Sequence, residues 1–344
     1  MQGLTGNRLK VAVIGGGSSY TPELLGGFFR RLESLPLGEL WLMDPSPSRL
    51  EVVGGFAQRL VTAWGNPFAV RLTTERREAL EGASYVIIQL RVGGMQARRE
   101  DEYLGRRHGL VGQETTGVGG MAKALRTIPV VLEIARELQT LAPGALLVNF
   151  ANPAGLVTEA LARHAAAVPA VGVCNVPITF TMQVLAALGE QLGRQVAPER
   201  AALDTLGLNH LSWHRGFAVD GQDLWPQVLA GFLARIRANP DDTVWDSRTV
   251  EVLGMIPNDY LQYYYYTARQ IARQDRWPPS RAEQVMAIEE RLLAQYADPG
   301  RSELPPDLLQ RGGAYYSTVA VQLLNAHYND LGERHVLNVP HRGA

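Results

Sequence analysis

The segment Val11–Glu23 constrains the fold most strongly, because it runs from an apolar strand through three glycines into the start of a helix. A dinucleotide-binding α/β fold places its phosphate loop in this way. Tyr20-Thr21-Pro22 stands where the usual dehydrogenase fingerprint has its third small residue, so the loop predicts a bound phosphate without deciding the chemistry. The expected cofactor-binding residues of the loop are Gly15, Gly16, Gly17, Ser18, Ser19 and Tyr20.

The N-terminal half continues as alternating strands and helices. Asp44 follows the second expected strand, where an acid can hold the ribose of an adenine dinucleotide; alternatively, it caps the short segment that begins at Pro45. The pattern predicts a Rossmann-like doubly wound parallel sheet in a nucleotide-binding domain (1–176), followed by an α+β domain (177–344) for substrate and metal. We expect strands at 10–14, 39–43, 84–90, 145–149 and 170–173, and helices at 22–32 and 119–141.

The composition excludes several classes of protein. A chain of 344 residues with 46% hydrophobic residues can form two domains with a large core. A formal net charge of −1 with scattered arginines predicts no nucleic-acid partner, and no apolar run is long enough to predict a membrane partner. Cys174 is the single cysteine and no leader precedes the first strand, so we expect a cytoplasmic protein that binds small molecules and copies of itself.

Four polar, glycine-rich segments follow the loop, at 89–94, 112–117, 149–153 and 207–213. Each has an ordinary explanation when taken alone. Arg91 can form a surface ion pair, Asn152 can start a turn before Pro153, and His210 can be a hydrogen-bonded core histidine. Their order along one chain is far more specific than any one of them.

Cys174 and His210 make a pair suited to a divalent transition metal, with substrate oxygens and water completing an open coordination shell. The alternative is that Cys174 is a small buried hydrophobe at the end of a strand. His214 is a second choice of ligand, since its segment does not decide between helix and strand. The tyrosines of 260–266 are typical of a core or an interface, although one beside a metal or a cation could ionise and act as a base.

In content and order these motifs resemble glycoside hydrolase family 4, the NAD- and metal-dependent glycosidases. The match runs from Val11 to about Glu290 and includes the glycine loop, the four segments above, Cys174-Asn175, the tyrosine run and Arg281-Ala-Glu. Membership implies a fold like that of lactate and malate dehydrogenases, the cofactors NAD and Mn²⁺, and a homodimer or homotetramer. The family usually continues well past residue 344, so we expect a C-terminal part to be lacking, with effects on stability, assembly and activity.

The resemblance also implies a redox-neutral elimination and addition on 6-phospho-β-glucosides, an exception to hydrolysis by two carboxylates. NAD⁺ oxidises C3 of the sugar, a tyrosine removes the C2 proton, the aglycone leaves, water adds, and C3 is reduced again. Cys174 and His210 are then the Mn²⁺ ligands, and Tyr260, the first tyrosine of the motif, is the base. The implied substrate-binding residues are Arg91, Glu114, Asn152, Asn175 and Arg281.

Within this set, Arg91 and Arg281 are expected to clamp the sugar 6-phosphate, for which planar guanidinium groups are fitting donors. Asn152 is expected to bind a substrate hydroxyl near the metal. Relatives that act on 6-phospho-α-glucosides have an aspartate after the cysteine, whereas this chain has Asn175, which favours β-glucosides.

Two other functions stay open from the sequence. One is an NAD-dependent dehydrogenase of the lactate and malate type, acting on a 2-hydroxy acid or a sugar, which would accumulate NADH and need no Cys174. The sequence has no evident Asp-to-His relay for that chemistry. The other is a catalytically weak protein that binds NAD and sugar phosphate, for which the early C-terminus is the only support.

Overall fold

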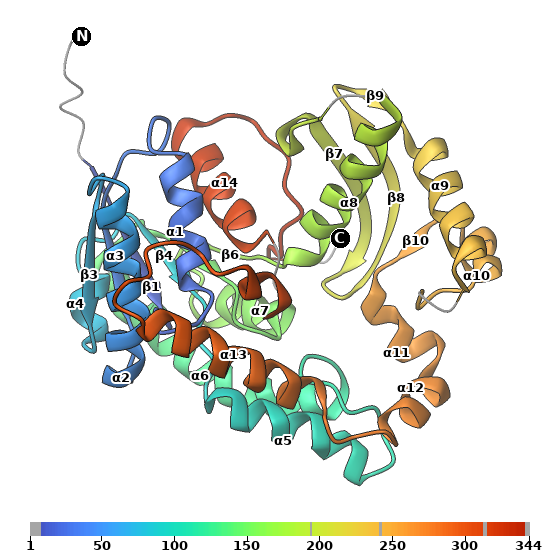
Figure 1. The fold of residues 1–344 in the computed structure, drawn as a ribbon, viewed down its shortest axis with the longest axis horizontal. Coiled ribbons are helices and arrows are strands. Elements are labelled where there is room, and N and C mark those ends of the chain that lie inside the picture. Colours follow the sequence, from blue (N-terminus) through green and yellow to red (C-terminus); the bar gives the residue numbers. More distant parts are fainter. Residues whose placement is uncertain (1–7, 193–194, 241–242, 312–314, 341–344) are drawn as a thin grey trace.

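The computed structural model describes residues 8–192, 195–240, 243–311 and 315–340. Its central sheet has six parallel strands in the order β3-β2-β1-β4-β5-β6 (Figure 1). This order confirms the doubly wound sheet, with the change of direction beside β1 and β4. The strands are β1 (Leu9–Ile14), β2 (Leu37–Met43), β3 (Ala69–Thr73), β4 (Tyr85–Ile88), β5 (Leu146–Asn149) and β6 (Ala170–Gly172).

Helices cover both faces of this sheet, because successive residues of a strand point to opposite sides. In β1, Val11 and Val13 belong to one hydrophobic core, and Ala12 and Ile14 belong to the other. The first core includes residues of α1 (Thr21–Arg30), α3 (Gly55–Ala63), α13 (Arg281–Ala297) and α14 (Tyr316–Asn329). The second includes residues of α4 (Arg76–Leu80), α6 (Gly117–Leu141) and α7 (Ala154–His164).

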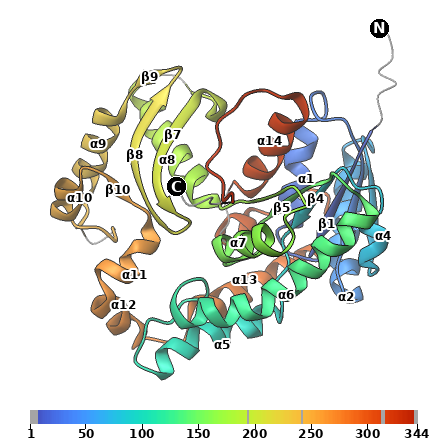
Figure 2. The ribbon, with the colours of Figure 1, turned by 180° about the vertical axis from the view of Figure 1, so that it is seen from behind.

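A second, antiparallel sheet forms the α+β part (Figures 1 and 2). Its path is β10-β8-β7, and β9 pairs with β8. Residues of three helices share a third core with this sheet. The elements are β7 (Ala201–Leu208), β8 (Leu211–Val219), β9 (Gln222–Asp223), β10 (Ile256–Pro257), α8 (Asn175–Leu192), α9 (Trp225–Ala238) and α10 (Ser247–Leu253).

The C-terminal helices return to the first sheet. In α13, Tyr296 stacks on Phe56 of α3 with ring centroids 4.5 Å apart, and α14 lies beside α1 (Figure 1). The division at residue 177 stays a prediction, and segments beyond it contribute to two cores. No helix in the described ranges has the length and apolar character that a membrane crossing requires.

Candidate active site

The glycine loop joins β1 to α1 and packs tightly on the ends of neighbouring strands. Gly15 has a φ of +93°, and a Cβ there would lie 2.7 Å from the Cα of Leu90. A Cβ on Gly16 would lie 2.8 Å from the Cα of Leu42. The N–H groups of both glycines donate to the Met43 carbonyl, at 2.9 and 2.7 Å. Only glycine fits these positions, as expected of a loop that a dinucleotide approaches closely.

Asp44, at the end of β2, holds this loop in place. Its Oδ2 accepts a hydrogen bond from the Gly17 N–H at 3.1 Å, and its Oδ1 accepts one from the Ser46 N–H at 3.0 Å. The capping role considered for Asp44 belongs to Ser46, whose Oγ accepts from the Arg49 N–H at the start of α2 (Pro47–Arg49). The carboxylate of Asp44 therefore lies beside the loop, and its contact with a ribose stays a prediction.

Ser18, Ser19 and Tyr20 begin the turn into α1. The Ser18 Oγ accepts from the Tyr20 N–H at 3.3 Å. Ser19 is fully buried, and its polar groups are satisfied within the protein. Its Oγ donates to Glu289 at 2.8 Å, and its carbonyl accepts from the Tyr296 hydroxyl at 2.8 Å. The structure therefore ties the loop to α13, a contact across 270 residues that the sequence does not indicate.

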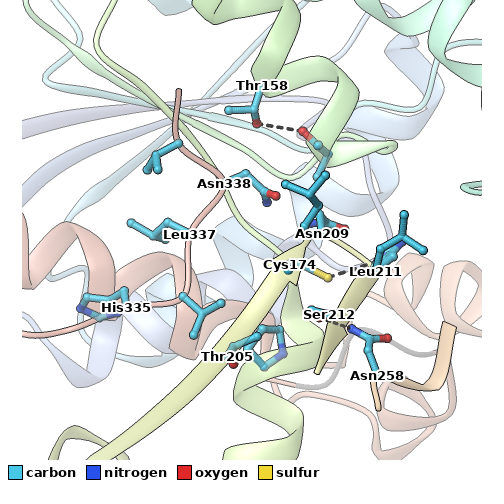
Figure 3. Close-up of a pocket in the computed structure, with 18 of the residues that line it drawn as sticks. Thr158, Cys174, Thr205, Asn209, Leu211, Ser212, Asn258, His335, Leu337 and Asn338 are labelled. Atoms are coloured by element: carbon cyan, nitrogen blue, oxygen red, sulfur yellow. Dashed lines mark hydrogen bonds between the residues drawn. The ribbon is translucent and has the colours of Figure 1, made fainter. Parts of the chain in front are cut away.

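Cys174 and His210 meet although they come from different parts of the fold. Cys174 lies between β6 and α8, and His210 lies in the tight turn between β7 and β8 with a φ of +59°. The Cys174 Sγ is 3.4 Å from the His210 Nε2. Figure 3 shows Cys174 near Asn209 and Leu211, the two residues that flank His210 in the chain. Burial raises the pKa of the Cys174 thiol to about 11 and lowers the pKa of His210 to about 4.

This pair fits a metal site that other ligands complete. The neutral imidazole offers a lone pair, and the thiol would release its proton on coordination. Among the described residues, no group of three or more His, Cys, Asp and Glu side chains is placed to hold a metal ion, so the protein would supply two ligands. An open site of this kind suits catalysis better than a structural role.

The structure decides between helix and strand for the segment of His214: it is a strand, and His214 does not share a helix face with His210. It lies on β8, buried, with its Nδ1 3.0 Å from the Thr205 Oγ1. Its ring stacks on Phe180 with centroids 4.4 Å apart. These neighbours account for His214 as a core residue of the second sheet.

Tyr260 packs directly against the pair. It lies in the short helix η4 (Asp259–Leu261), where its N–H donates to the Asn258 Oδ1 at 3.0 Å; Asn258 in turn donates to the Ser212 Oγ of β8 at 3.3 Å. The Tyr260 ring stacks on His210 with centroids 3.7 Å apart and planes within 4°. Burial raises the pKa of Tyr260 well above its usual value, and the Arg98 guanidinium opposes that rise.

A buried carboxylate, that of Glu114, faces three cations beside this stack. It accepts hydrogen bonds from Arg91 and from the Lys123 Nζ at 2.5 Å, and its Oε1 is 3.2 Å from the Arg98 Nη1. Burial by itself raises the pKa of Glu114, but the three cations outweigh it and hold that pKa well below the usual value. Burial lowers the pKa of Lys123 to about 8. The cluster carries excess positive charge, which favours an anionic substrate.

Lys123 and Arg98 are site residues that the sequence analysis missed. Lys123 carries one signal, since Lys10 and Lys123 are the two lysines among 33 basic residues. In a chain whose basic residues are almost all arginine, the lysine at position 123 is unusual, and it is only 5% exposed. Arg98, in α5 (Gly94–Arg107), has no comparable signal, because it is one of many arginines.

The remaining predicted residues lie at the starts of helices or shortly after a strand. Asn152 follows β5, where its Oδ1 accepts from the Ala154 N–H at 3.3 Å, and Asn175 starts α8 directly after Cys174. Arg281 is the first residue of α13 and is exposed, and its Nη2 donates to the Arg311 carbonyl at 3.4 Å. The roles of these residues in substrate binding stay predictions.

Cys174 and His210 line a large cleft between the two sheets, with a volume of about 2200 Å³. Thr115, Asn258 and Tyr264 also line it. The cleft is wide enough for a small-molecule ligand, and the cysteine and histidine lie in its wall.

Comparisons with known proteins agree with this geometry. The model of the family 4 glycosyl hydrolases matches residues 10–190, and that of the family 4 glycosyl hydrolase C-terminal domain matches residues 205–344. A probable 6-phospho-beta-glucosidase of Bacillus subtilis (strain 168) is 41% identical over 345 residues, covering 98% of this chain and 77% of the relative.

Solved structures give the same result. The 6-phospho-beta glucosidase from Thermotoga maritima, solved with manganese, NAD⁺ and glucose-6-phosphate, is 34% identical with a TM-score of 0.84. That match covers 92% of this chain and 73% of the other. Malate dehydrogenase from Cryptosporidium parvum is 16% identical with a TM-score of 0.51, over 98% of this chain and 83% of the other, a likeness of fold alone that agrees with the expected architecture. The two family matches together span most of the sequence, and this chain therefore belongs to glycosyl hydrolase family 4.

Proposed function

We propose that this protein hydrolyses 6-phospho-β-glucosides, such as phosphorylated cellobiose, to glucose 6-phosphate and an aglycone. The observation that carries the proposal is the contact of Cys174 Sγ with His210 Nε2 at 3.4 Å, with the Tyr260 ring stacked on that histidine. Two carboxylates flanking a sugar would indicate ordinary glycoside hydrolysis, whereas this centre is a thiol, an imidazole and a phenol. The names of the relatives support the same substrate class.

The residues fit NAD at the glycine loop beside Asp44, and Mn²⁺ or another divalent transition metal at Cys174 and His210. When bound, these groups supply reversible hydride transfer at C3 of the sugar and polarisation of the C3 oxygen.

The protein's own residues handle the proton at C2. Tyr260 receives it on its phenolic oxygen, which requires the ionised form. Burial raises the pKa of Tyr260 and disfavours that form, Arg98 opposes the rise only in part, and a cation bound at Cys174 and His210 would favour the ionised form further. Lys123 and Arg98 together add positive charge where negative charge develops on the sugar oxygens, and Glu114 fixes their positions. Buried, preorganised charges of this kind act without reorganisation during the reaction.

The remaining substrate contacts complete the assignment. Arg91 and Arg281 are assigned to the 6-phosphate, and Asn152 to a sugar hydroxyl near the metal. Asn175 follows Cys174 directly, and its amide side chain cannot donate a proton as a carboxylic acid would, so departure of the aglycone relies on water or on a good leaving group. An asparagine at this position, where relatives that act on 6-phospho-α-glucosides have an aspartate, supports the β-glucoside over the α-glucoside.

We also propose that the protein works in the cytoplasm as a homodimer or homotetramer. Two exposed apolar side chains that line the cleft support an assembly that would cover them, since Leu125 is 70% exposed and Leu208 is 65% exposed.

The test is release of nitrophenol from p-nitrophenyl 6-phospho-β-glucoside, with NAD⁺, Mn²⁺ and a thiol reductant, while absorbance reports NADH. The α-anomer and the unphosphorylated β-glucoside are the matched controls. We expect release that needs both cofactors, with no accumulating NADH and little reaction of either control. Accumulating NADH without nitrophenol would indicate a dehydrogenase instead, and tight NAD⁺ binding with neither signal would indicate a binding protein.

A further inference from the structure

Glu289 of α13 places a buried carboxylate on the glycine loop, outside the hydrolytic centre. It is 7% exposed, and its Oε1 accepts hydrogen bonds from the Ser19 Oγ at 2.8 Å and from the Arg49 Nη2 at 2.9 Å. The Arg311 Nη2 is 3.6 Å from the same oxygen. A carboxylate with this set of donors is firmly held, and it offsets part of the positive charge of Arg49 and Arg311.

Arg49 is fixed on a second side as well. Its Nε donates to the Gly17 carbonyl at 2.8 Å, so the guanidinium lies between the loop and Glu289. A Cβ on Gly17 would come within 2.8 Å of both the Asp44 Cγ and the Arg49 Cβ. The carboxyl of Asp44 and the stem of Arg49 therefore flank the same glycine.

This arrangement bears on which dinucleotide can bind. In Rossmann folds an acid after the second strand binds the ribose 2′-hydroxyl of NAD, and a nearby arginine accommodates the 2′-phosphate of NADP. Arg49 stands beside Asp44, where such an arginine would be expected, but its Nε and Nη2 are directed to the Gly17 carbonyl and to Glu289, whose carboxylate offsets its charge. A guanidinium that is oriented and partly neutralised by a carboxylate attracts a phosphate less strongly than a free one.

We propose that Glu289 is a specificity-determining residue, which withholds Arg49 from the adenosine 2′-position and so, together with Asp44, selects NAD over NADP. The proposal rests on the proposed binding of a dinucleotide at the glycine loop. Part of the selectivity for NAD would then lie in α13, far along the chain, and not only in the first βαβ unit.

The test compares the dissociation constants of NAD⁺ and NADP⁺, measured by titration calorimetry on the full chain, for the wild type and Glu289→Gln. Glu290→Gln is the matched control, because Glu290 is the next residue of α13 and is exposed. We expect Glu289→Gln to improve NADP⁺ binding relative to NAD⁺ by about tenfold, since a freed guanidinium forms charge-assisted bonds with a phosphate. Adding Arg49→Ala should restore the original ratio.

An unchanged ratio in Glu289→Gln, with NAD⁺ still bound, would overturn the proposal and leave the proposed function intact. Equal weakening of both dinucleotides would overturn it too, by showing that Glu289 only supports the loop. If Glu289→Gln does not fold, Arg49→Gln in the wild-type background decides: the proposal expects NADP⁺ binding to change less than twofold, and a tenfold loss would contradict it. A wild type that binds neither dinucleotide would instead refute the proposed function.

Discussion

The carboxylate of Glu114 is the shared counter-charge for Arg91, Lys123 and Arg98, and among the described residues only Arg98 has a further carboxylate, Glu102, at 3.0 Å. Glu114→Gln should destabilise the fold by about 3–5 kcal/mol, because it leaves buried charges uncompensated. Lys123→Met should have a smaller effect, about 1–3 kcal/mol, since two arginines still satisfy the carboxylate. Urea denaturation measures both variants, with Glu100→Gln as the control, because the half-exposed Glu100 pairs with Arg99 and Arg107 near the surface. Equal losses for Glu100→Gln and Glu114→Gln would contradict this account of the cluster.

Cys174 is the residue whose role separates metal chemistry from cofactor binding. Cys174→Ala should abolish metal-dependent release of nitrophenol while NAD⁺ affinity changes less than about twofold, because the thiol contacts His210 and the glycine loop lies on other strands. Activity assays and calorimetry on one preparation measure both. Retained Mn²⁺-dependent activity in this variant would refute the metal assignment.

At the residue scale, the sequence allowed the Cys174 and His210 pair to be predicted, because a soft ligand pair stands within an ordered set of motifs. It could not give Arg98 or Glu289, because neither has a local signature and each acquires its role by contact with residues of another element. The contact of Tyr260 with His210 depends on the fold of η4 against β8, which the tyrosine-rich run does not encode by itself.

At the scale of elements, Glu283 anchors the start of α13 and makes stability depend on pH. It accepts from the Ser280 N–H at 2.6 Å, the Arg99 Nε at 2.9 Å and the Tyr103 hydroxyl at 3.0 Å. The Ser280 backbone bond, followed by Arg99, lowers the pKa of Glu283 to about 2. This carboxylate is therefore charged in the folded protein at a pH where the unfolded chain already binds the proton.

Because its pKa is depressed on folding, the contribution of Glu283 is complete above the unfolded value of about 4.3 and is lost as pH falls towards 2. Glu283→Gln should be less stable than the wild type at pH 6, and the difference should shrink between pH 5 and pH 3. Urea denaturation at each pH measures it. A difference that stays constant across this range would contradict the assignment.

Five of the six strands of the first sheet were predictable to within about two residues at each end, because each is a short apolar run bounded by turn residues, whereas β3 was not predicted. The second sheet was not predicted strand by strand. β7 is exposed at five of its eight positions, and its sequence Ala-Ala-Leu-Asp-Thr-Leu-Gly-Leu lacks the strict apolar–polar alternation that would indicate a strand. The return of α13 and α14 to the first core could not be predicted, because periodicity shows that a helix has an apolar face but not what covers it.

At the scale of the whole molecule, the glycine loop, α13 and α14 share one core, so cofactor binding should stabilise the chain well beyond the loop. NAD⁺ at 100 times its dissociation constant should add about 2.7 kcal/mol to the free energy of unfolding. Thermal unfolding with and without NAD⁺ measures this, and Cys174→Ala should show the same gain. No shift in the wild type would contradict cofactor binding at the loop.

The central claim is that the glycosidic bond breaks after a proton leaves C2, and deuterium labelling tests it directly. Turnover of the 6-phospho-β-glucoside in D₂O, with NAD⁺ and Mn²⁺, is followed by NMR or mass spectrometry of the glucose 6-phosphate formed. The account predicts deuterium at C2 of the product, with incorporation strongly reduced in Tyr260→Phe. A product that keeps its original hydrogen at C2 would show direct displacement at C1 and contradict the account.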